Sequence, residues 1–183
     1  AASDVYKRQE YYLDGEKIYG MPTPKLRESD RLTKNSAIET EPALSPDGRY
    51  LALISDRTGS PQVYVRDMQR KKMTRITESG KYNVSPSWSP DGKFIAYASR
   101  RSGVSSIYRI DPKSKEENRV TPKNMNVESP SWSPDGSMIA FSGKKGGDWK
   151  IYYSLSSGGQ AVRLTNSKAG LQETMPSWGP SLR

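Results

Sequence analysis

The chain repeats itself every 44 residues, and this period restricts its possible folds more than any other feature. The tetrapeptide Ser45-Pro46-Asp47-Gly48 returns as Ser89–Gly92 and as Ser133–Gly136, with a spacing of 44 residues both times. A further proline stands four residues before each turn proline, at positions 42, 86 and 130. Repeats of this length that contain several short strands are typical of β-propeller blades.

Each repeat contains four segments with the pattern of β-strands, termed A to D. Strand A enters the turn, B is apolar as in 50–55, C alternates as in 62–65, and D is short, as in 74–77, 118–121 and 162–165. Proline and glycine in the turn suit a tight connection between antiparallel strands. The sequence therefore predicts an all-β fold, a β-propeller of four-stranded antiparallel blades in a partial ring.

The repeat also sets the predicted organisation of the chain. The predicted units are a partial first blade at 10–40, full blades at 41–84, 85–128 and 129–174, and a closing strand A at 175–183. Residues 1–9 stand apart, because Asp4–Gln9 can be encoded by GAT GTG TAT AAG AGA CAG, which resembles a transposase adapter. We expect this segment to be non-native; the alternative is a polar N-terminal strand.

The residues that recur in the turns are predicted to be structural, because an active site rarely occurs in triplicate. The alternative for the three aspartates is a metal or catalytic role. Trp88, Trp132 and Trp178 are predicted to pack between blades, with stacking against a ligand as the alternative. The predicted structural turn residues are Pro46, Asp47, Gly48, Pro90, Asp91, Gly92, Pro134, Asp135 and Gly136.

Composition excludes several kinds of chemistry. The 183 residues include no histidine and no cysteine, so a Ser-His-Asp triad, a thiolate nucleophile and a cysteine metal site cannot form within this chain. No catalytic residue, metal or cofactor is predicted. The net charge of +9 is spread along the chain, which indicates a solvated basic surface more than a nucleic-acid site. The apolar runs are far shorter than the about 20 residues that span a bilayer, so no membrane insertion is predicted.

Strand direction alternates within a blade, so the A–B turns and C–D loops share one face and the B–C and D–A loops share the other. The B–C and D–A loops vary in length and charge between repeats, as expected of loops that recognise a binding partner. These loops are predicted at 56–61, 100–105 and 143–148 for B–C, and at 78–84, 122–128 and 166–174 for D–A. Charges on this face and near the channel are the predicted partner-binding residues: Arg57, Arg100, Arg101, Lys144, Lys145, Glu41, Glu128 and Glu173.

The repeat resembles those of TolB-type propellers over about residues 10–183. The resemblance rests on Glu41–Gly48, on Ser55–Val65, on Arg75–Thr77 and on the chain end Pro176–Leu182. Departures from the pattern are a leucine at 44 where tryptophan is usual, a glycine at 179 where serine is usual, and a loose fit over 11–31. Within that stretch, Ile18-Tyr19 and 31–33 are predicted as a C and a D strand.

The resemblance implies a periplasmic, non-enzymatic, protein-binding propeller of the Tol–Pal cell-envelope system, connected with envelope integrity, cell division and protein transport. It implies binding to the peptidoglycan-associated lipoprotein, Pal, and to other Tol-system proteins in the intact protein. It also implies a six-bladed ring after a small α/β domain and an export signal, so that about two blades are missing here. The alternative is the gating propeller of a prolyl-oligopeptidase-like serine peptidase, which carries the same repeat before a hydrolase domain.

Overall fold

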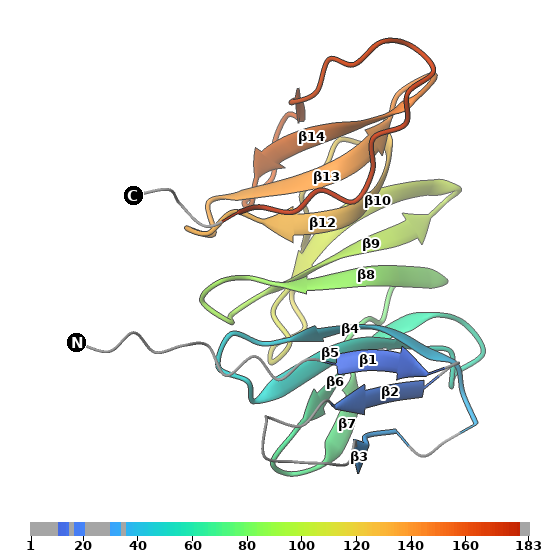
Figure 1. Ribbon diagram of the computed structural model, residues 1–183, viewed down its shortest axis with the longest axis vertical. Helices are drawn as coiled ribbons and strands as arrows, with labels where there is room; N and C mark the ends of the chain where they lie inside the picture. The colour runs from blue at the N-terminus through green and yellow to red at the C-terminus, as the bar shows by residue number, and fades with distance from the viewer. Residues whose placement is uncertain (1–10, 15–16, 21–29, 34–35, 180–183) are drawn as a thin grey trace.

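The computed structural model describes residues 11–14, 17–20, 30–33 and 36–179, and no helix occurs among them (Figure 1). The predicted non-native segment at 1–9 lies outside the described residues, as do positions 180–183 of the predicted closing strand. The described part consists of successive antiparallel sheets in which strands follow one another in chain order.

Three of the sheets have four strands each, and a three-stranded sheet precedes them. The three-stranded sheet comprises β1 (Tyr11–Asp14), β2 (Lys17–Gly20) and β3 (Asp30–Arg31). The first full blade comprises β4 (Glu39–Leu44), β5 (Tyr50–Ser55), β6 (Gln62–Asp67) and β7 (Lys72–Arg75). The second comprises β8 (Tyr82–Trp88), β9 (Ile95–Arg101), β10 (Val104–Ile110) and β11 (Glu117–Arg119). The third comprises β12 (Asn126–Trp132), β13 (Met138–Lys144), β14 (Trp149–Leu155) and β15 (Val162–Arg163). The predicted fold class, a partial β-propeller of four-stranded antiparallel blades, is confirmed.

The first strand of each full blade contains a bulge at its proline. In β4 the pairing with β5 shifts between Thr40 and Ala43, and the same shift occurs in β8 and β12. Proline has no N–H to donate to the ladder, so the strand bends there. The residue before the proline has a positive φ each time: Glu41 51°, Ser85 55°, Ser129 55° and Met175 55°.

The repeat boundaries drawn at 85 and 129 lie inside β8 and β12, because these strands begin before the bulge. Residues 175–179 share the left-handed turn at Met175 but form no strand. Their backbone instead reaches the third blade through side chains. The amide of Met175 donates to Ser142 Oγ at 2.9 Å and that of Trp178 to Ser131 Oγ at 3.3 Å.

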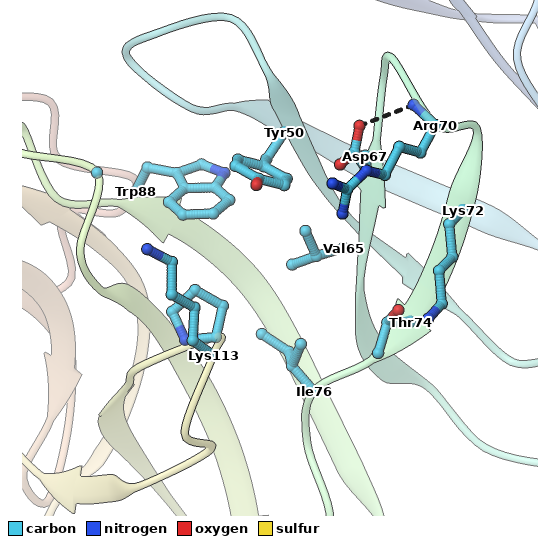
Figure 2. Close-up of a pocket in the computed structure, with 11 residues that line it drawn as sticks. Tyr50, Val65, Asp67, Arg70, Lys72, Thr74, Ile76, Trp88 and Lys113 are labelled. Carbon is cyan, nitrogen blue, oxygen red and sulfur yellow. Dashed lines mark hydrogen bonds between the residues drawn. The ribbon is translucent and has the colours of Figure 1, made fainter.

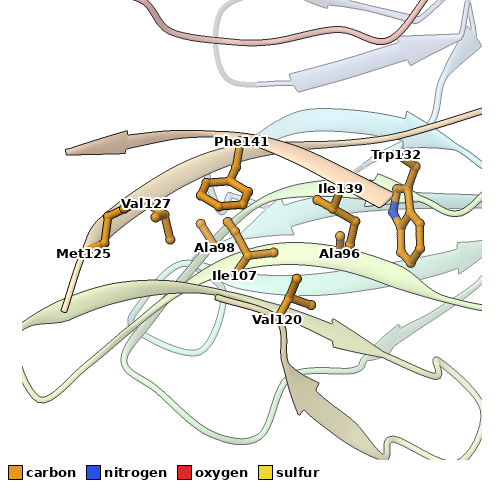
Figure 3. Close-up of a cluster of buried hydrophobic side chains, with 9 residues drawn as sticks. All are labelled: Ala96, Ala98, Ile107, Val120, Met125, Val127, Trp132, Ile139 and Phe141. Carbon is orange, nitrogen blue, oxygen red and sulfur yellow. The ribbon is translucent and has the colours of Figure 1, made fainter. Parts of the chain in front are cut away.

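The hydrophobic core lies between consecutive blades. Figure 3 shows the cluster between the second and third blades, and β4 lies beside β8 as β8 lies beside β12. Trp88 at the end of β8 and Trp132 at the end of β12 each belong to such a cluster and bond back to the previous blade. The indole N–H of Trp88 donates to the carbonyl oxygen of Ala43, and that of Trp132 to Ser87, both at 3.0 Å. The cluster in Figure 3 consists of Ala96, Ala98, Ile107, Val120, Met125, Val127, Trp132, Ile139 and Phe141.

The B–C connections are shorter than the sequence predicted in two blades. The predicted loop at 100–105 was wrong, because β9 continues to Arg101 and β10 begins at Val104. Only Ser102 and Gly103 form the turn, and both have positive φ, 49° and 84°, which matches the two-residue hairpin turn that suits twisted strands. In the third blade Lys144 likewise ends β13. These strand ends were not predicted because their side chains are polar. An exposed hairpin does not require apolar residues, so the sequence pattern carries no strand signal there.

The D strands also end earlier than predicted. The ladder ends before Thr77, Thr121 and Thr165, although the sequence placed all three in strands. Their hydroxyl oxygens accept a hydrogen bond from the backbone of strand C, as Thr77 Oγ1 does from the amide of Val63 at 3.1 Å. The other two accept from residues 107 and 151 at 3.0 Å each. A side chain therefore replaces a backbone carbonyl at this point of each of the three full blades.

A substitution of Gly143 by alanine tests the tight packing of the third blade. A Cβ atom at this buried position would lie 2.6 Å from Met125 Sδ and 2.8 Å from Tyr152 Cδ2. We expect Gly143→Ala to lower the free energy of unfolding by about 1 to 3 kcal/mol, the usual cost of overpacking a core. Urea denaturation measures this. In the control Gly179→Ala, where no atom lies within 4 Å of the new Cβ, we expect a change within about 0.5 kcal/mol; equal values for the two variants would contradict the prediction.

Candidate functional site

The Ser-Pro-Asp-Gly turns form one end of the blades, and their aspartates are engaged within the turns. Oδ1 of Asp135 accepts hydrogen bonds from Ser133 Oγ at 2.6 Å and from the amide of Ser137 at 3.0 Å. The hydrogen bond from Ser133 is the main cause that lowers the pKa of Asp135 to about 2. Asp47 and Asp91 accept the equivalent bonds, and their pKa values are lowered as well, first by Ser45 and Ser89.

Successive turns also contact one another. A Cβ atom at Gly92 would lie 3.7 Å from Cδ of Pro46, and one at Gly136 would lie 3.7 Å from Cδ of Pro90. Both glycines have positive φ, 68° and 73°, which disfavours any other residue there. These contacts support the prediction that the nine turn residues are structural, and the role stays a prediction.

Two of the predicted partner-binding arginines make ion pairs within the protein. Arg57 and Arg101 occupy the same position in consecutive repeats, and each lies over a tyrosine ring of strand C. The Cζ atom is 4.8 Å from the centroid of Tyr64 in the first case and 3.7 Å from that of Tyr108 in the second. Arg57 pairs with the fully buried side chain of Glu39. Both residues are therefore held by their own blade.

Arg101 forms the more extended of these two arrangements. Its Nη1 and Nη2 donate to Oε1 and Oε2 of Glu117, both at 2.8 Å, and the Tyr97 hydroxyl also donates to this carboxylate. Burial pushes the pKa of Glu117 upward, but the hydrogen bonds from Arg101 and Tyr97 outweigh it and hold the pKa below its ordinary value. Burial and the hydrogen bond to Glu117 raise the pKa of the Tyr97 hydroxyl. The group is a neutralised, partly buried cluster.

Glu173 is likewise engaged, by a lysine that sequence reasoning missed. Its carboxylate accepts from Thr165 Oγ1 at 2.7 Å, which is the main cause that lowers the pKa of Glu173, and lies 3.5 Å from Lys150 Nζ. Lys150 is buried, and its ammonium donates to the carbonyl oxygen of Leu171 at 2.7 Å and to Ser167. Gln62 stands two repeats earlier, and its amide oxygen accepts from Asn83 Nδ2 at 2.7 Å. Positions 62 and 150 are equivalent in the repeat, and both side chains bond to the segment that follows strand D. Alignment of the repeats could therefore have indicated this role for Lys150.

The remaining predicted charges are exposed at the B–C and D–A end or on strand A. Arg100, Lys144, Lys145 and Glu128 make no ion pair with any other residue in the described part. Glu41 accepts a hydrogen bond from the amide of Ser85, 2.6 Å away on the next blade. The structure therefore divides the eight predicted residues. Four charges are free to meet a partner, and four are bonded within the protein.

Tyr82 is a second residue that sequence reasoning missed at this end. It begins β8, is 49% exposed and pairs directly with Arg100 on β9. Together with Lys81 and the β9–β10 hairpin, these residues line an open hollow of about 430 Å³. Tyrosine and arginine are enriched among the residues that dominate binding energy in protein interfaces. This hollow is the candidate centre of a partner-binding face.

No group of three or more acidic, histidine or cysteine side chains within the described ranges could hold a metal ion. The same ranges contain no helix with the length and apolarity required to cross a bilayer. At the end formed by the B–C and D–A connections, Arg100 and the exposed ring of Tyr82 can take part in recognition by charge, hydrogen bonds and aromatic contact.

The fold and this end together define a class, the β-propellers built from tandem four-stranded blades with Ser-Pro-Asp-Gly turns. The family model described as the TolB beta propeller domain matches residues 11–182, so the chain belongs to this family. The Tol-Pal system protein TolB of Bordetella pertussis is 50% identical over 34 residues, 19% of this chain and 8% of that protein.

Solved structures of TolB agree with this assignment. TolB from Acinetobacter baumannii is 30% identical, with a TM-score of 0.79 over 93% of this chain and 42% of that one. Putative TolB from Agrobacterium tumefaciens is 25% identical, with a TM-score of 0.73 over 88% of this chain and 60% of that one. The chain thus spans less than two thirds of either relative. A prolyl endopeptidase at 17% identity and a TM-score of 0.63 shares the fold alone.

Proposed function

We propose that the chain is the protein-binding propeller of a Tol–Pal system TolB, that it resides in the periplasm and that it acts by binding without catalysis. Membership of the TolB propeller family supports this proposal. The absence of histidine and cysteine from the sequence also supports it, since the commonest general base and the thiolate nucleophile are both missing. Neither nucleic acid nor insertion into a membrane forms part of the proposed function.

The proposed partner is the peptidoglycan-associated lipoprotein, with other Tol-system proteins contacting the intact protein. The observation that carries the proposal is the hollow at Tyr82 and Arg100, on the end where the connections vary from blade to blade. The exposed cations of Lys144 and Lys145, which make no ion pair in the described part, extend this end across the third blade. Such an arrangement suits a folded protein partner with an acidic rim, because complementary charges steer the encounter and an aromatic anchor supplies affinity.

Binding to the soluble domain of the peptidoglycan-associated lipoprotein tests the proposal. We expect Tyr82→Ala to raise the Kd about 30-fold, as loss of a central anchor costs about 2 kcal/mol. The double charge reversal Lys144→Glu/Lys145→Glu should raise the Kd about tenfold, mainly through a slower association rate that depends on salt. Surface plasmon resonance at two salt concentrations separates the two effects.

Lys71→Glu is the matched control, because Lys71 is equally exposed but lies on the C–D turn at the opposite end. It should leave the Kd within about twofold. The proposal fails if the wild-type chain does not bind this lipoprotein, or if Lys71→Glu weakens binding as much as the double reversal does.

A further inference from the structure

A cavity of about 210 Å³ lies between the first and second full blades, at the end formed by the A–B turns and C–D loops. Its walls are apolar and aromatic (Figure 2): Val65 and Ile76 project from one blade, and Trp88 from the other. The rings of Tyr50 and Trp88 stack with their centroids 6.3 Å apart. An apolar cavity of about 150 Å³ is large enough to hold benzene, so this one has room for an aromatic ring.

The rim of the cavity is basic. Arg70 and Lys72 line it from the first blade and Lys113 from the second (Figure 2), and all three side chains are exposed. None of them makes an ion pair within the part of the chain that the structure describes. Cations placed around an apolar cavity favour an occupant with an apolar body and a negative charge at its end.

Asp67 is the one acidic residue among those that line the cavity, and its carboxylate is already engaged. Its Oδ1 accepts hydrogen bonds from the amides of Arg70 at 2.9 Å and Gln69 at 3.0 Å. The bond from Arg70 is the main cause that lowers the pKa of Asp67, so the residue is an anion at neutral pH. Three cations against one anion leave the lining with a net charge of +2.

The next blade interface shows what is special about this cavity. The residue equivalent to Val65, 44 positions later, is Arg109, whose Cζ lies 4.7 Å from the ring centroid of Phe94, the equivalent of Tyr50. There an arginine replaces the apolar wall beside the ring, and the hollow of about 350 Å³ that remains is also lined by the carboxylates of Asp91 and Asp135. The equivalents of Arg70, Lys72 and Lys113 are Ser114, Glu116 and Ser157, so that rim is not basic. Both interfaces are therefore hollow at this end, but only the first combines the apolar wall of Val65 with a cationic rim.

We propose that this cavity binds a small apolar carboxylate, with its ring or branched apolar group against Trp88, Val65 and Ile76 and its carboxylate at Arg70, Lys72 and Lys113. The site lies at the opposite end of the blades from Tyr82 and Arg100, so it is independent of the proposed partner-binding face. Apolar burial supplies the affinity, and the charge-assisted contacts at the rim select an anion over a neutral molecule.

Titration with phenylacetate, followed by calorimetry and by the intrinsic tryptophan fluorescence, to which Trp88 contributes, tests this site. We expect saturable binding with one site per chain, and at least tenfold weaker binding of phenylacetamide, which has the same shape without the charge. Val65→Arg should place a guanidinium over Tyr50, as Arg109 does over Phe94, and abolish binding. Lys72→Gln/Lys113→Gln, which changes only exposed side chains, should weaken binding about tenfold even if Val65→Arg does not fold. Lys123→Gln, an exposed substitution elsewhere, should leave the affinity unchanged.

Three outcomes would overturn the proposal. The first is an absence of saturable phenylacetate binding at millimolar concentration. The second is equal affinity for phenylacetate and phenylacetamide, or unchanged affinity in the Lys72→Gln/Lys113→Gln variant. The third is binding of the peptide acetyl-Gly-Phe with a free carboxyl terminus at least tenfold more tightly than phenylacetate, with loss on amidation, which would assign the cavity to a peptide terminus.

Discussion

Replacing Trp132 with alanine is expected to lower the free energy of unfolding by about 3 to 5 kcal/mol, the usual cost of removing a large aromatic side chain from a core. The side chain is 7% exposed and fills the space between the second and third blades. Its indole N–H also donates to the carbonyl oxygen of Ser87, which would be left without this partner. Guanidinium chloride denaturation, followed by circular dichroism, measures the loss.

Two further variants make the result interpretable. Trp132→Phe keeps most of the apolar contact but loses the hydrogen bond, and it should cost about 1 to 2 kcal/mol. Trp178→Ala is the matched control. Trp178 occupies the same repeat position, but it is only half-buried and its indole nitrogen has no hydrogen-bond partner among the described residues. Comparable losses in Trp132→Ala and Trp178→Ala would show that packing between blades does not set the cost.

Glu117→Gln is expected to lower the free energy of unfolding at pH 7 by about 2 kcal/mol, between the values for surface and fully buried ion pairs. The substitution preserves shape but leaves the Arg101 guanidinium without its carboxylate partner. Because the pKa of Glu117 is depressed in the folded protein, its stabilisation is complete above the unfolded-state pKa. That stabilisation disappears as the pH falls through the folded-state pKa.

The stability difference between the wild type and Glu117→Gln should therefore shrink as the pH is lowered from 7 to below 4.5, the ordinary pKa of a glutamate. Thermal unfolding at a series of pH values measures this. Glu78→Gln is the control, since Glu78 is 70% exposed in its pair with Lys115 and the substitution should leave the free energy of unfolding nearly unchanged at every pH. A difference between the wild type and Glu117→Gln that stays constant down to pH 3 would contradict the assignment.

The sequence predicted the fold well because its strongest signals concern the backbone. A Ser-Pro-Asp-Gly turn requires one conformation wherever it stands, so three copies at equal spacing predict three equivalent hairpins. The bulge before each hairpin also follows from a fixed proline, although its left-handed residue can be glutamate, serine or methionine. Strand ends were predicted less well. The polar side chains of Arg100 and Arg101 predict a loop. Both residues belong to a strand only because their backbone pairs with the neighbouring strands β8 and β10.

The candidate site could be predicted only in part, since residue type does not reveal whether a charge already has a partner. Arg57 and Arg100 differ little in sequence context, yet one pairs with buried Glu39 and the other is exposed. The cavity at Val65 was equally hidden. Valine is an ordinary strand residue, and only the comparison with Arg109 at the same place of the next blade shows that Val65 leaves an apolar wall beside the aromatic ring.

The bonds between blades have a consequence for how the chain acquires its structure during synthesis. Trp88 bonds to a carbonyl 45 residues earlier, Trp132 does the same, and the amide of Ser85 reaches a carboxylate 44 residues earlier. Each of these contacts therefore spans a single repeat. A blade that leaves the ribosome finds its docking surface already in place on the blade before it, so assembly can proceed in the direction of translation. Because each contact closes a chain segment of about the same length, the entropy cost of docking is about the same for each blade. The partial ring can therefore grow by equivalent steps, one blade at a time.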